Sequence, residues 1–370
     1  MSNAAHARRI HDSLPVVDGH NDLPWRIRVE AGGDLDAADP GGPLPGFHTD
    51  IPRMLEGGVG AQLWSVYVPA TIASPFAQTL AQIDLVEAMV GRDNRLESAR
   101  TGGEAAAIRD SGRIASLMGA EGGHSIENSL DNLGVLAGRG VRYMTLTHSD
   151  TIEWADSATD EATHGGLTRF GRDVVMEMNR LGMLVDLSHV SADTMRDALD
   201  ASAAPVIASH SNAYARVPHP RNIPDDVLRE IGDRGGVVMA VFFPGFVMRS
   251  TAAQLMDLFA EWRTVRAEFG DDEAAIAAEI ERRERKLDLD RGAVADVVDH
   301  IEYIAEVAGI HAVGLGSDFD GMTIAPMGLE DASCYPAVTV ELLDRGWPEP
   351  DIRRVLGENS LRVLDVGPAG

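Results

Sequence analysis

Residues 183–211 read MLVDLSHVSADTMRDALDASAAPVIASHS and contain the pattern that decides the fold. Two short apolar runs, Leu184–Leu187 and Val206–Ser209, have the length and composition of buried strands. Between them, Ser191–Ala201 places its apolar residues at helical spacing. A strand, a helix and a second strand in this order predict two parallel strands joined by a right-handed crossover.

The same alternation extends along most of the chain. Six further apolar runs are predicted strands: Leu14–Asp18, Ala61–Val68, Ile114–Gly119, Tyr143–Thr147, Val237–Phe243 and Ala312–Gly316. Helical patterns lie at Ala77–Val90, Thr168–Leu181, Pro224–Arg234 and Val294–Ala308. Eight strands in this order favour a single α/β domain over residues 1–370, a (β/α)8 TIM barrel, although a doubly wound open sheet would show much the same alternation.

Two segments interrupt the alternation. Thr251–Lys286 is rich in Ala, Glu and Arg and is too long for a simple connection. We expect it to form one or two exposed helices, inserted after the seventh strand, that flank or cover the active site. Ala31–Gly46 is rich in Gly, Pro and Asp, which predicts an irregular loop soon after the first strand.

The composition excludes several classes of protein. Asp and Glu outnumber Lys and Arg by 58 to 32, giving a formal net charge of −26 that repels nucleic acid and anionic membrane surfaces. Cys334 is the only cysteine, so an intramolecular disulfide and cysteine-based metal clusters are excluded. The sequence shows neither a secretory signal pattern nor a run of about 18 apolar residues. We therefore expect a cytoplasmic protein without a membrane anchor.

Histidines stand at the ends of several predicted strands. His20 and Asp22 close the first strand as His-x-Asp, a spacing that puts both side chains on one face of an extended backbone. His189 and His210 follow the two strands of the opening segment. In this type of barrel the active site is built where the strands end, so these side chains are expected to meet.

Three more strand ends carry polar groups. Glu121, His148 and Asp318 each follow a further predicted strand. A buried carboxylate must be paired, coordinated or hydrated, and neutral imidazole and carboxylate suit zinc. Any one of these residues could be an unrelated polar group at a loop start, but six strand ends in one chain favour a common metal site. His124 and His219 lie in neighbouring loops, and their role stays open.

The segments around these residues resemble the membrane dipeptidase (renal dipeptidase) family of zinc metallopeptidases in the amidohydrolase-like superfamily. The resemblance covers nearly the whole chain and rests on DGHNDLPW (18–25), GAEGGHSI (119–126), RYMTLTHSD (142–150), WADS (154–157), MLVDLSHVS (183–191), ASHSNAY (208–214), RNIPDD (221–226) and GSDFDG (316–321). It implies a metal-dependent barrel enzyme that cuts dipeptides, L,L and also L,D, into free amino acids.

The resemblance implies two Zn²⁺ ions per chain. His20 and Asp22 would hold one ion, His189 and His210 the other, and Glu121 would bridge the two together with a water or hydroxide. Two neighbouring cations lower the pKa of such a water and polarise the scissile carbonyl. The bridging hydroxide would then attack the peptide bond.

The resemblance also implies roles for three other residues. Asp318 would act as general base and then as general acid. His148 would contact the substrate and stabilise the developing oxyanion. Arg221 would bind the C-terminal carboxylate of the substrate, because a guanidinium matches a carboxylate in shape and charge. Such a clamp would favour dipeptides over longer chains.

Two other functions stay open from the sequence. One is another amidohydrolase reaction on the same barrel, with an N-acyl amino acid, a lactone or a deaminase substrate. Many such barrels bridge their metals with a carboxylated lysine. The only lysine of this chain, Lys286, lies in the insertion, so it does not follow a predicted strand. A metal-binding scaffold without catalysis would not need Asp318 and His148. We expect a small dipeptide as substrate and a homodimer, which is common for such barrels.

Overall fold

Eight parallel strands form a closed barrel in the computed structural model, which describes residues 2–270 and 272–367. The strands are β1 (Val16–Asn21), β2 (Val59–Ser65), β4 (Ile114–Glu121), β5 (Val141–Thr145), β6 (Leu184–Asp186), β7 (Ile207–Ala208), β8 (Val237–Ala240) and β9 (Val313–Leu315). Their order is β2-β1-β9-β8-β7-β6-β5-β4, and the pairing of β2 with β4 closes the ring. The predicted (β/α)8 barrel is confirmed, and the open-sheet alternative is wrong.

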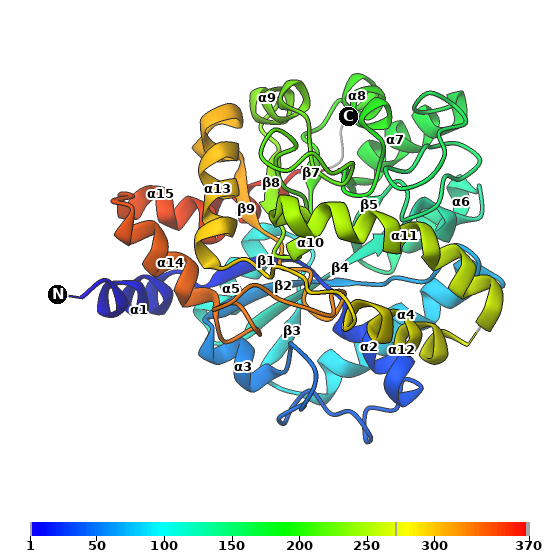
Figure 1. The fold of residues 1–370 in the computed structure, drawn as a ribbon. Coiled ribbons are helices and arrows are strands. Elements are labelled where there is room, and N and C mark those ends of the chain that lie inside the picture. The colour runs from blue at the N-terminus through cyan, green and yellow to red at the C-terminus, as the bar shows by residue number, and fades with distance from the viewer. Residues whose placement is uncertain (1, 271, 368–370) are drawn as a thin grey trace.

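Helices surround the barrel (Figure 1). The five predicted helices are α4 (Pro75–Arg92), α7 (Arg169–Leu181), α8 (Ala192–Ala201), α9 (Asp225–Asp233) and α13 (Val294–Ala308). Outside the insertion, the other α-helices of the described residues are α1 (Asn3–Ser13), α2 (Leu23–Ala31), α3 (Ile51–Glu56), α5 (Gly102–Asp110), α6 (Leu130–Gly138), α10 (Pro244–Val247), α14 (Tyr335–Asp344), α15 (Glu349–Arg353) and α16 (Asn359–Leu364). Thr168 and Ser191, predicted as the first helical residues of α7 and α8, are instead N-caps whose hydroxyls accept backbone N–H bonds.

The observed strands differ from the predicted ones by one to three residues at most of their ends, and by one additional strand. A ninth strand, β3 (Leu96–Ser98), pairs with the first residues of β4 and extends the sheet beside the barrel. It escaped prediction because it has three residues and only Leu96 is buried. The predicted strand Val237–Phe243 ends at Ala240, because Pro244 begins α10 directly after Phe243.

The predicted insertion forms two helices, α11 (Arg249–Phe269) and α12 (Glu273–Glu284). In Figure 1, α11 crosses in front of the strands and α12 lies beside α2, which it contacts. The two ends of the insertion meet, because the hydroxyl of Thr251 donates to the carbonyl of Asp290 at 2.5 Å. Near the C-terminal end of the insertion, at the last residue of α12, buried Glu284 accepts a hydrogen bond from Thr323, in the loop that follows β9.

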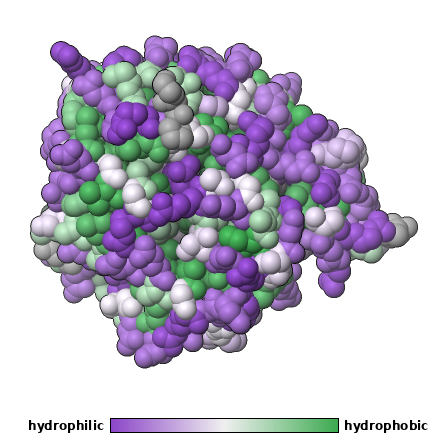
Figure 2. Space-filling view, turned by 180° about the vertical axis from the view of Figure 1, so that it is seen from behind, coloured by the Kyte–Doolittle hydropathy of each residue, from purple (hydrophilic) through white to green (hydrophobic). Residues whose placement is uncertain are grey.

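The outer surface agrees with the acidic composition. Hydrophilic residues cover most of the face seen in Figure 2, with hydrophobic ones interspersed among them. Within the described residues, every helix is too short or too polar to span a lipid bilayer.

The ends of β7 and β9 can approach each other closely only because residue 316 is glycine. A Cβ on Gly316 would lie 1.8 Å from the carbonyl oxygen of Ser209, which belongs to the backbone and has little freedom to move. The ends of β7 and β9, which carry two of the predicted functional residues, can therefore approach only with glycine at 316.

We expect Gly316→Ala to lower the free energy of unfolding by about 3 kcal/mol, because the new methyl group forces the two backbones apart. Gly91→Ala is the control: Gly91 lies inside α4 with open space around it, and alanine there should raise stability by about 0.5–1 kcal/mol. Urea unfolding followed by circular dichroism measures both. A Gly316→Ala protein as stable as the wild type would contradict the prediction.

The burial of His11 predicts that the stability of the fold depends on pH. It is buried, its Nδ1 lies 3.2 Å from the carbonyl of Gly57 and its Nε2 lies 2.7 Å from the hydroxyl of Thr339. Burial lowers the pKa of His11 from 6.5 to about 4. The unfolded chain therefore takes up this proton first, and stability is lost as pH falls from 6.5 towards 4.

Between pH 7.5 and pH 5, we expect the wild type to lose about 2 kcal/mol more unfolding free energy than His11→Gln, which has no proton to take up. Urea unfolding of both proteins at the two pH values measures the difference. Equal losses would show that His11 titrates normally in the fold.

Candidate metal centre

The strand ends bring the predicted residues to one mouth of the barrel. His20 lies in β1 and Glu121 ends β4. The remaining residues follow their strands by one to three positions: Asp22 after β1, His148 after β5, His189 after β6, His210 after β7 and Asp318 after β9. All lie at the carboxyl ends of parallel strands, as predicted.

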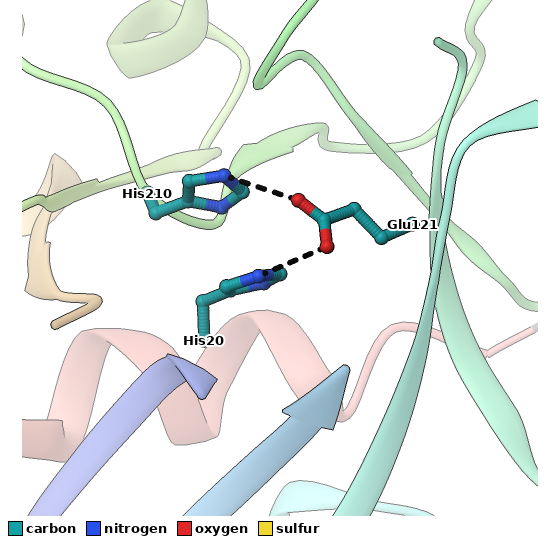
Figure 3. A group of neighbouring side chains, drawn as sticks. All are labelled: His20, Glu121 and His210. Carbon is teal, nitrogen blue, oxygen red and sulfur yellow. Dashed lines mark ion pairs between the residues drawn. The ribbon is translucent and has the colours of Figure 1, made fainter. Parts of the chain in front are cut away.

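Glu121 stands between two sets of ligating atoms. Figure 3 shows His20 and His210 facing its carboxylate, with Nε2 of His20 3.4 Å from Oε2 and Nε2 of His210 3.5 Å from Oε1. Asp22 Oδ2 lies 3.3 Å from Nε2 of His20, and Nε2 of His189 lies 3.0 Å from Oε1 of Glu121. One oxygen of Glu121 thus faces His20, which lies beside Asp22, and the other faces His189 and His210.

Hydrogen bonds from inside the barrel orient two of these imidazoles. Nδ1 of His20 pairs with the hydroxyl of Tyr143 at 2.9 Å. Ser209 donates to Asp186 at 2.5 Å, so its oxygen is left to accept from Nδ1 of His210 at 2.8 Å. A histidine that donates through Nδ1 presents the lone pair of Nε2, the arrangement usual for metal-binding histidines.

The atoms at this mouth fit divalent cations. Nε2 of His20 and Oδ1 of Asp22 are buried without a hydrogen-bond partner, and the Nε2 atoms of His189 and His210 lie 2.8 Å apart. Three overlapping groups have ligand atoms within 4.8 Å of one another: His20, Glu121 and His210; Glu121, His148 and His189; and His20, Asp22 and Asp318. Buried nitrogen and carboxylate ligands that converge in this way suit zinc.

Burial shifts the titration of the same groups. It raises the pKa of Asp318 well above its usual value, and the neighbouring charge of Asp22 raises it further. Burial also raises the pKa of Glu121, and it lowers the pKa of His148 and of His189 well below the usual value. Neutral imidazole is the form that binds a metal, and cations offset the cost of burying carboxylates.

Arg221 is almost fully buried beside the centre, with 1% of its surface exposed. Its Nη1 donates to the hydroxyl of Ser211 and its Nη2 to the carbonyl of His210, both at 3.2 Å, while Nε has no hydrogen-bond partner. Burial lowers the pKa of Arg221 to about 10. Its hydrogen-bond partners among the described residues are neutral oxygens, and the charges of Asp318, Glu121 and Asp186 act on it without such a bond, so this guanidinium can bind an anion.

The sequence did not reveal every residue that shapes the centre. Tyr143, Ser209 and Asp186 lie within the quoted segments, yet no supporting role was predicted for them; the available signal was a polar residue inside an apolar strand. His189 and Asp318 adopt left-handed backbone conformations, with φ of 69° and 68°, which are uncommon outside glycine and cluster at functional sites. No sequence pattern marked these turns.

The two histidines whose role stayed open lie next to the centre. Nε2 of His124 lies 2.8 Å from the carbonyl of Val68, and Nδ1 of His219 accepts from the backbone N–H of Arg221 at 3.1 Å. Neither belongs to the three groups of converging ligand atoms.

The insertion flanks the centre. Burial raises the pKa of Tyr67, whose ring lies 4.6 Å from that of His148, and Arg266 on α11 acts in the opposite direction. Arg266 therefore lies within electrostatic reach of the mouth of the barrel.

Solved structures similar to this chain include several peptidases. The probable dipeptidase PvdM from Pseudomonas aeruginosa is 23% identical, with a TM-score of 0.83 over 98% of each chain, which shows the fold. Dipeptidase AC, a metallopeptidase, is 27% identical, with a TM-score of 0.77 over 96% of this chain and 99% of that one.

A third similar structure is a metallopeptidase from Rhodobacter sphaeroides bound to a phosphinate mimic of the dipeptide L-Ala-D-Ala. It is 26% identical, with a TM-score of 0.76 over 96% of this chain and 99% of that one. A sequence model described as membrane dipeptidase (peptidase family M19) matches residues 4–366, nearly the whole chain. The chain belongs to the membrane dipeptidase family.

Proposed function

We propose that this chain hydrolyses dipeptides to free amino acids at a centre of two zinc ions. Membership of the membrane dipeptidase family supports the reaction. The observation that carries the two-ion centre is Glu121, whose two carboxylate oxygens face different sets of ligands. His20 and Asp22 would hold one ion, and His189 and His210 the other. When bound, the ions supply a water of lowered pKa and polarise the scissile carbonyl.

Asp318 is proposed to move the proton. Its carboxyl group lies within one of the converging groups, with His20 and Asp22, and burial raises its pKa. A carboxylate held there takes a proton from the attacking water and delivers it to the nitrogen of the leaving amino acid, as general base and then general acid. The proton thus passes from the nucleophile to the leaving group through one side chain.

His148 is proposed to stabilise the oxyanion. Its Nε2 lies 3.7 Å from Oε1 of Glu121, and its side chain is 17% exposed, so it faces both the centre and the space for substrate. Its Nδ1 lies 3.1 Å from the hydroxyl of Ser149. An imidazole N–H directed at the carbonyl oxygen stabilises the negative charge that develops there.

Arg221 is proposed to bind the substrate carboxylate. A dipeptide has its C-terminal carboxylate on the residue directly after the scissile bond, so a buried guanidinium beside the centre selects for that length. Both L and D residues carry this carboxylate, and the Rhodobacter sphaeroides relative was solved with a mimic of L-Ala-D-Ala. We therefore include L,D dipeptides among the proposed substrates.

N-acyl amino acids are the second candidate class of substrate. They share the amide and the adjoining carboxylate, so Arg221 favours them over lactones and over deaminase substrates. Parallel assays of dipeptides and N-acetyl amino acids separate the two classes, because only a dipeptide offers a free α-amino group.

We expect chelation to abolish dipeptide hydrolysis, and two zinc ions per chain to restore it. Glu121→Gln should bind fewer than two ions, because one of the two facing oxygens becomes an amide nitrogen. Metal content by mass spectrometry and hydrolytic activity, measured on the same sample, test these two expectations. Exposed Glu56→Gln is the control and should keep both ions. A full complement of two ions in Glu121→Gln would refute the bridge.

Asp318→Asn should keep both metal ions and lower kcat by about 10²–10⁴-fold, because asparagine cannot accept the proton. Steady-state kinetics with metal analysis measure this, with exposed Asp200→Asn as the control. A rate near that of the wild type would assign the proton transfer to another group.

A further inference from the structure

The two sides of Glu121 differ in the ligands that they offer. The Asp22 side comprises His20, Asp22 and Oε2 of Glu121, and the His189 side comprises His189, His210 and Oε1 of Glu121. In Figure 3 the two oxygens point towards His20 and His210. Apart from the shared carboxylate, the Asp22 side offers a second carboxylate, whereas the other two ligands of the His189 side are imidazoles. The Asp22 side is thus the more negative of the two.

A neighbouring positive charge increases this difference. The guanidinium of Arg221 donates to the carbonyl of His210 at 3.2 Å. Burial lowers the pKa of His189 well below its usual value, and the charge of Arg221 lowers it further. The same guanidinium acts on Asp318, so Asp22 is the carboxylate on which the difference depends. A divalent cation is therefore attracted more strongly on the Asp22 side.

The Asp22 side also has the greater need of a cation. Asp22 is 5% exposed, and its Oδ1 and the Nε2 atom of His20 are buried with no hydrogen-bond partner among the described residues. On the His189 side, the Nε2 atoms of His189 and His210 lie 2.8 Å apart, where one ring can donate to the other. A buried carboxylate oxygen without a donor is costly, and a bound cation removes that cost. Binding an ion on the Asp22 side therefore relieves more than binding one on the His189 side.

Hydrogen bonds to the outer nitrogens of the imidazoles differ in the same direction. Nδ1 of His20 pairs with the hydroxyl of Tyr143, and Nδ1 of His210 pairs with that of Ser209. Nδ1 of His189 is buried and has no partner among the described residues. An outer partner fixes a metal-binding imidazole and raises its basicity, and its loss costs roughly 10–100-fold in metal affinity. One of the two imidazoles on the His189 side lacks this support.

The support of His20 is built into the barrel interior. The ring of Tyr143 fills the space beside Gly119, where a Cβ would lie 1.9 Å from the ring. Its hydroxyl donates to the carbonyl of Gly19 at 3.4 Å, so the oxygen is left to accept from Nδ1 of His20 at 2.9 Å. Packing therefore holds Tyr143 in place, and the bond that orients His20 is formed in advance of metal binding.

We propose that the ion on the Asp22 side binds first and is held tightly, whereas the ion on the His189 side is exchangeable, so that zinc supply switches the enzyme between an inactive one-ion form and an active two-ion form. Tyr143 is a positioning residue for the first ion. The inference rests on the proposed two-zinc dipeptidase and adds the regulation of that site.

The test equilibrates the zinc-loaded full chain with buffers of decreasing free Zn²⁺ and measures zinc per chain by mass spectrometry. We expect two steps separated by about 100-fold in free Zn²⁺, because the missing partner of His189 alone accounts for about 10–100-fold. Hydrolysis of Ala-Ala should be lost with the first ion released, while one ion stays bound.

One substitution on each side identifies which ion is which. His189→Ala should lose the weak step and keep the tight step at the wild-type concentration of free Zn²⁺. Asp22→Asn should lose the tight step, because it removes the carboxylate that only this side has. A tight step that disappears in His189→Ala and remains in Asp22→Asn would overturn the assignment.

Tyr143→Phe tests the positioning role, because it keeps the ring beside Gly119 and removes only the hydroxyl. It should shift the tight step by about tenfold towards higher free Zn²⁺ and leave the weak step unchanged, whereas a general loss of packing would shift both steps. Tyr303→Phe is the matched control: this hydroxyl also donates a hydrogen bond, to Asp225, but lies on α13 outside the centre. It should keep both steps.

Two ions released in a single step would overturn this proposal and leave the two-ion function standing. A one-ion form that cuts Ala-Ala at the full rate would overturn the switch, and wild-type steps in Tyr143→Phe would overturn the positioning role. Two separate steps in a protein that cuts no dipeptide would support the order of binding and overturn the proposed function.

Discussion

The structure depends on a carboxylate buried where eight strands end. Glu121 is 4% exposed, and a lone charge in such a place costs several kcal/mol. Its surroundings offset part of that cost. Ser65 donates to Oε2 at 2.9 Å, and the imidazoles of His20, His189 and His210, from three other strand ends, lie near the two oxygens. The two cations proposed for the centre would add a positive charge on each side of this carboxylate and lower the cost further.

The barrel interior meets this requirement through hydrogen bonds and small residues. Tyr143 and Ser209 hold the outer nitrogens of two imidazoles, and Asp186 in turn orients Ser209. Gly316 lets the end of β9 pass close to the backbone of Ser209, beside His210. The side chains of the centre thus lie in the strands or within three residues of their ends, so the pairing of the strands fixes their relative positions.

The sequence predicted the barrel and the members of the centre because both depend on periodic patterns. Apolar runs marked all eight strands, and polar residues after six of these runs marked the site. It could not predict features set by tertiary contact. β3 has too few buried residues to give a pattern, the left-handed turns at His189 and Asp318 break local preference, and the hydrogen bond between Tyr143 and His20 joins strands distant in sequence.

The insertion begins and ends at one place, where Thr251 binds the carbonyl of Asp290. A segment whose two ends lie in contact adds little strain to the barrel into which it is inserted. Its length and sequence can therefore vary while the strands stay in register. α11 and α12 are in this sense an exchangeable module, and Arg266 and Glu273 are among the residues through which they act electrostatically on Tyr67 at the mouth of the barrel. Evolution or design could retune the entrance by replacing this module alone, leaving Glu121 and its ligands untouched.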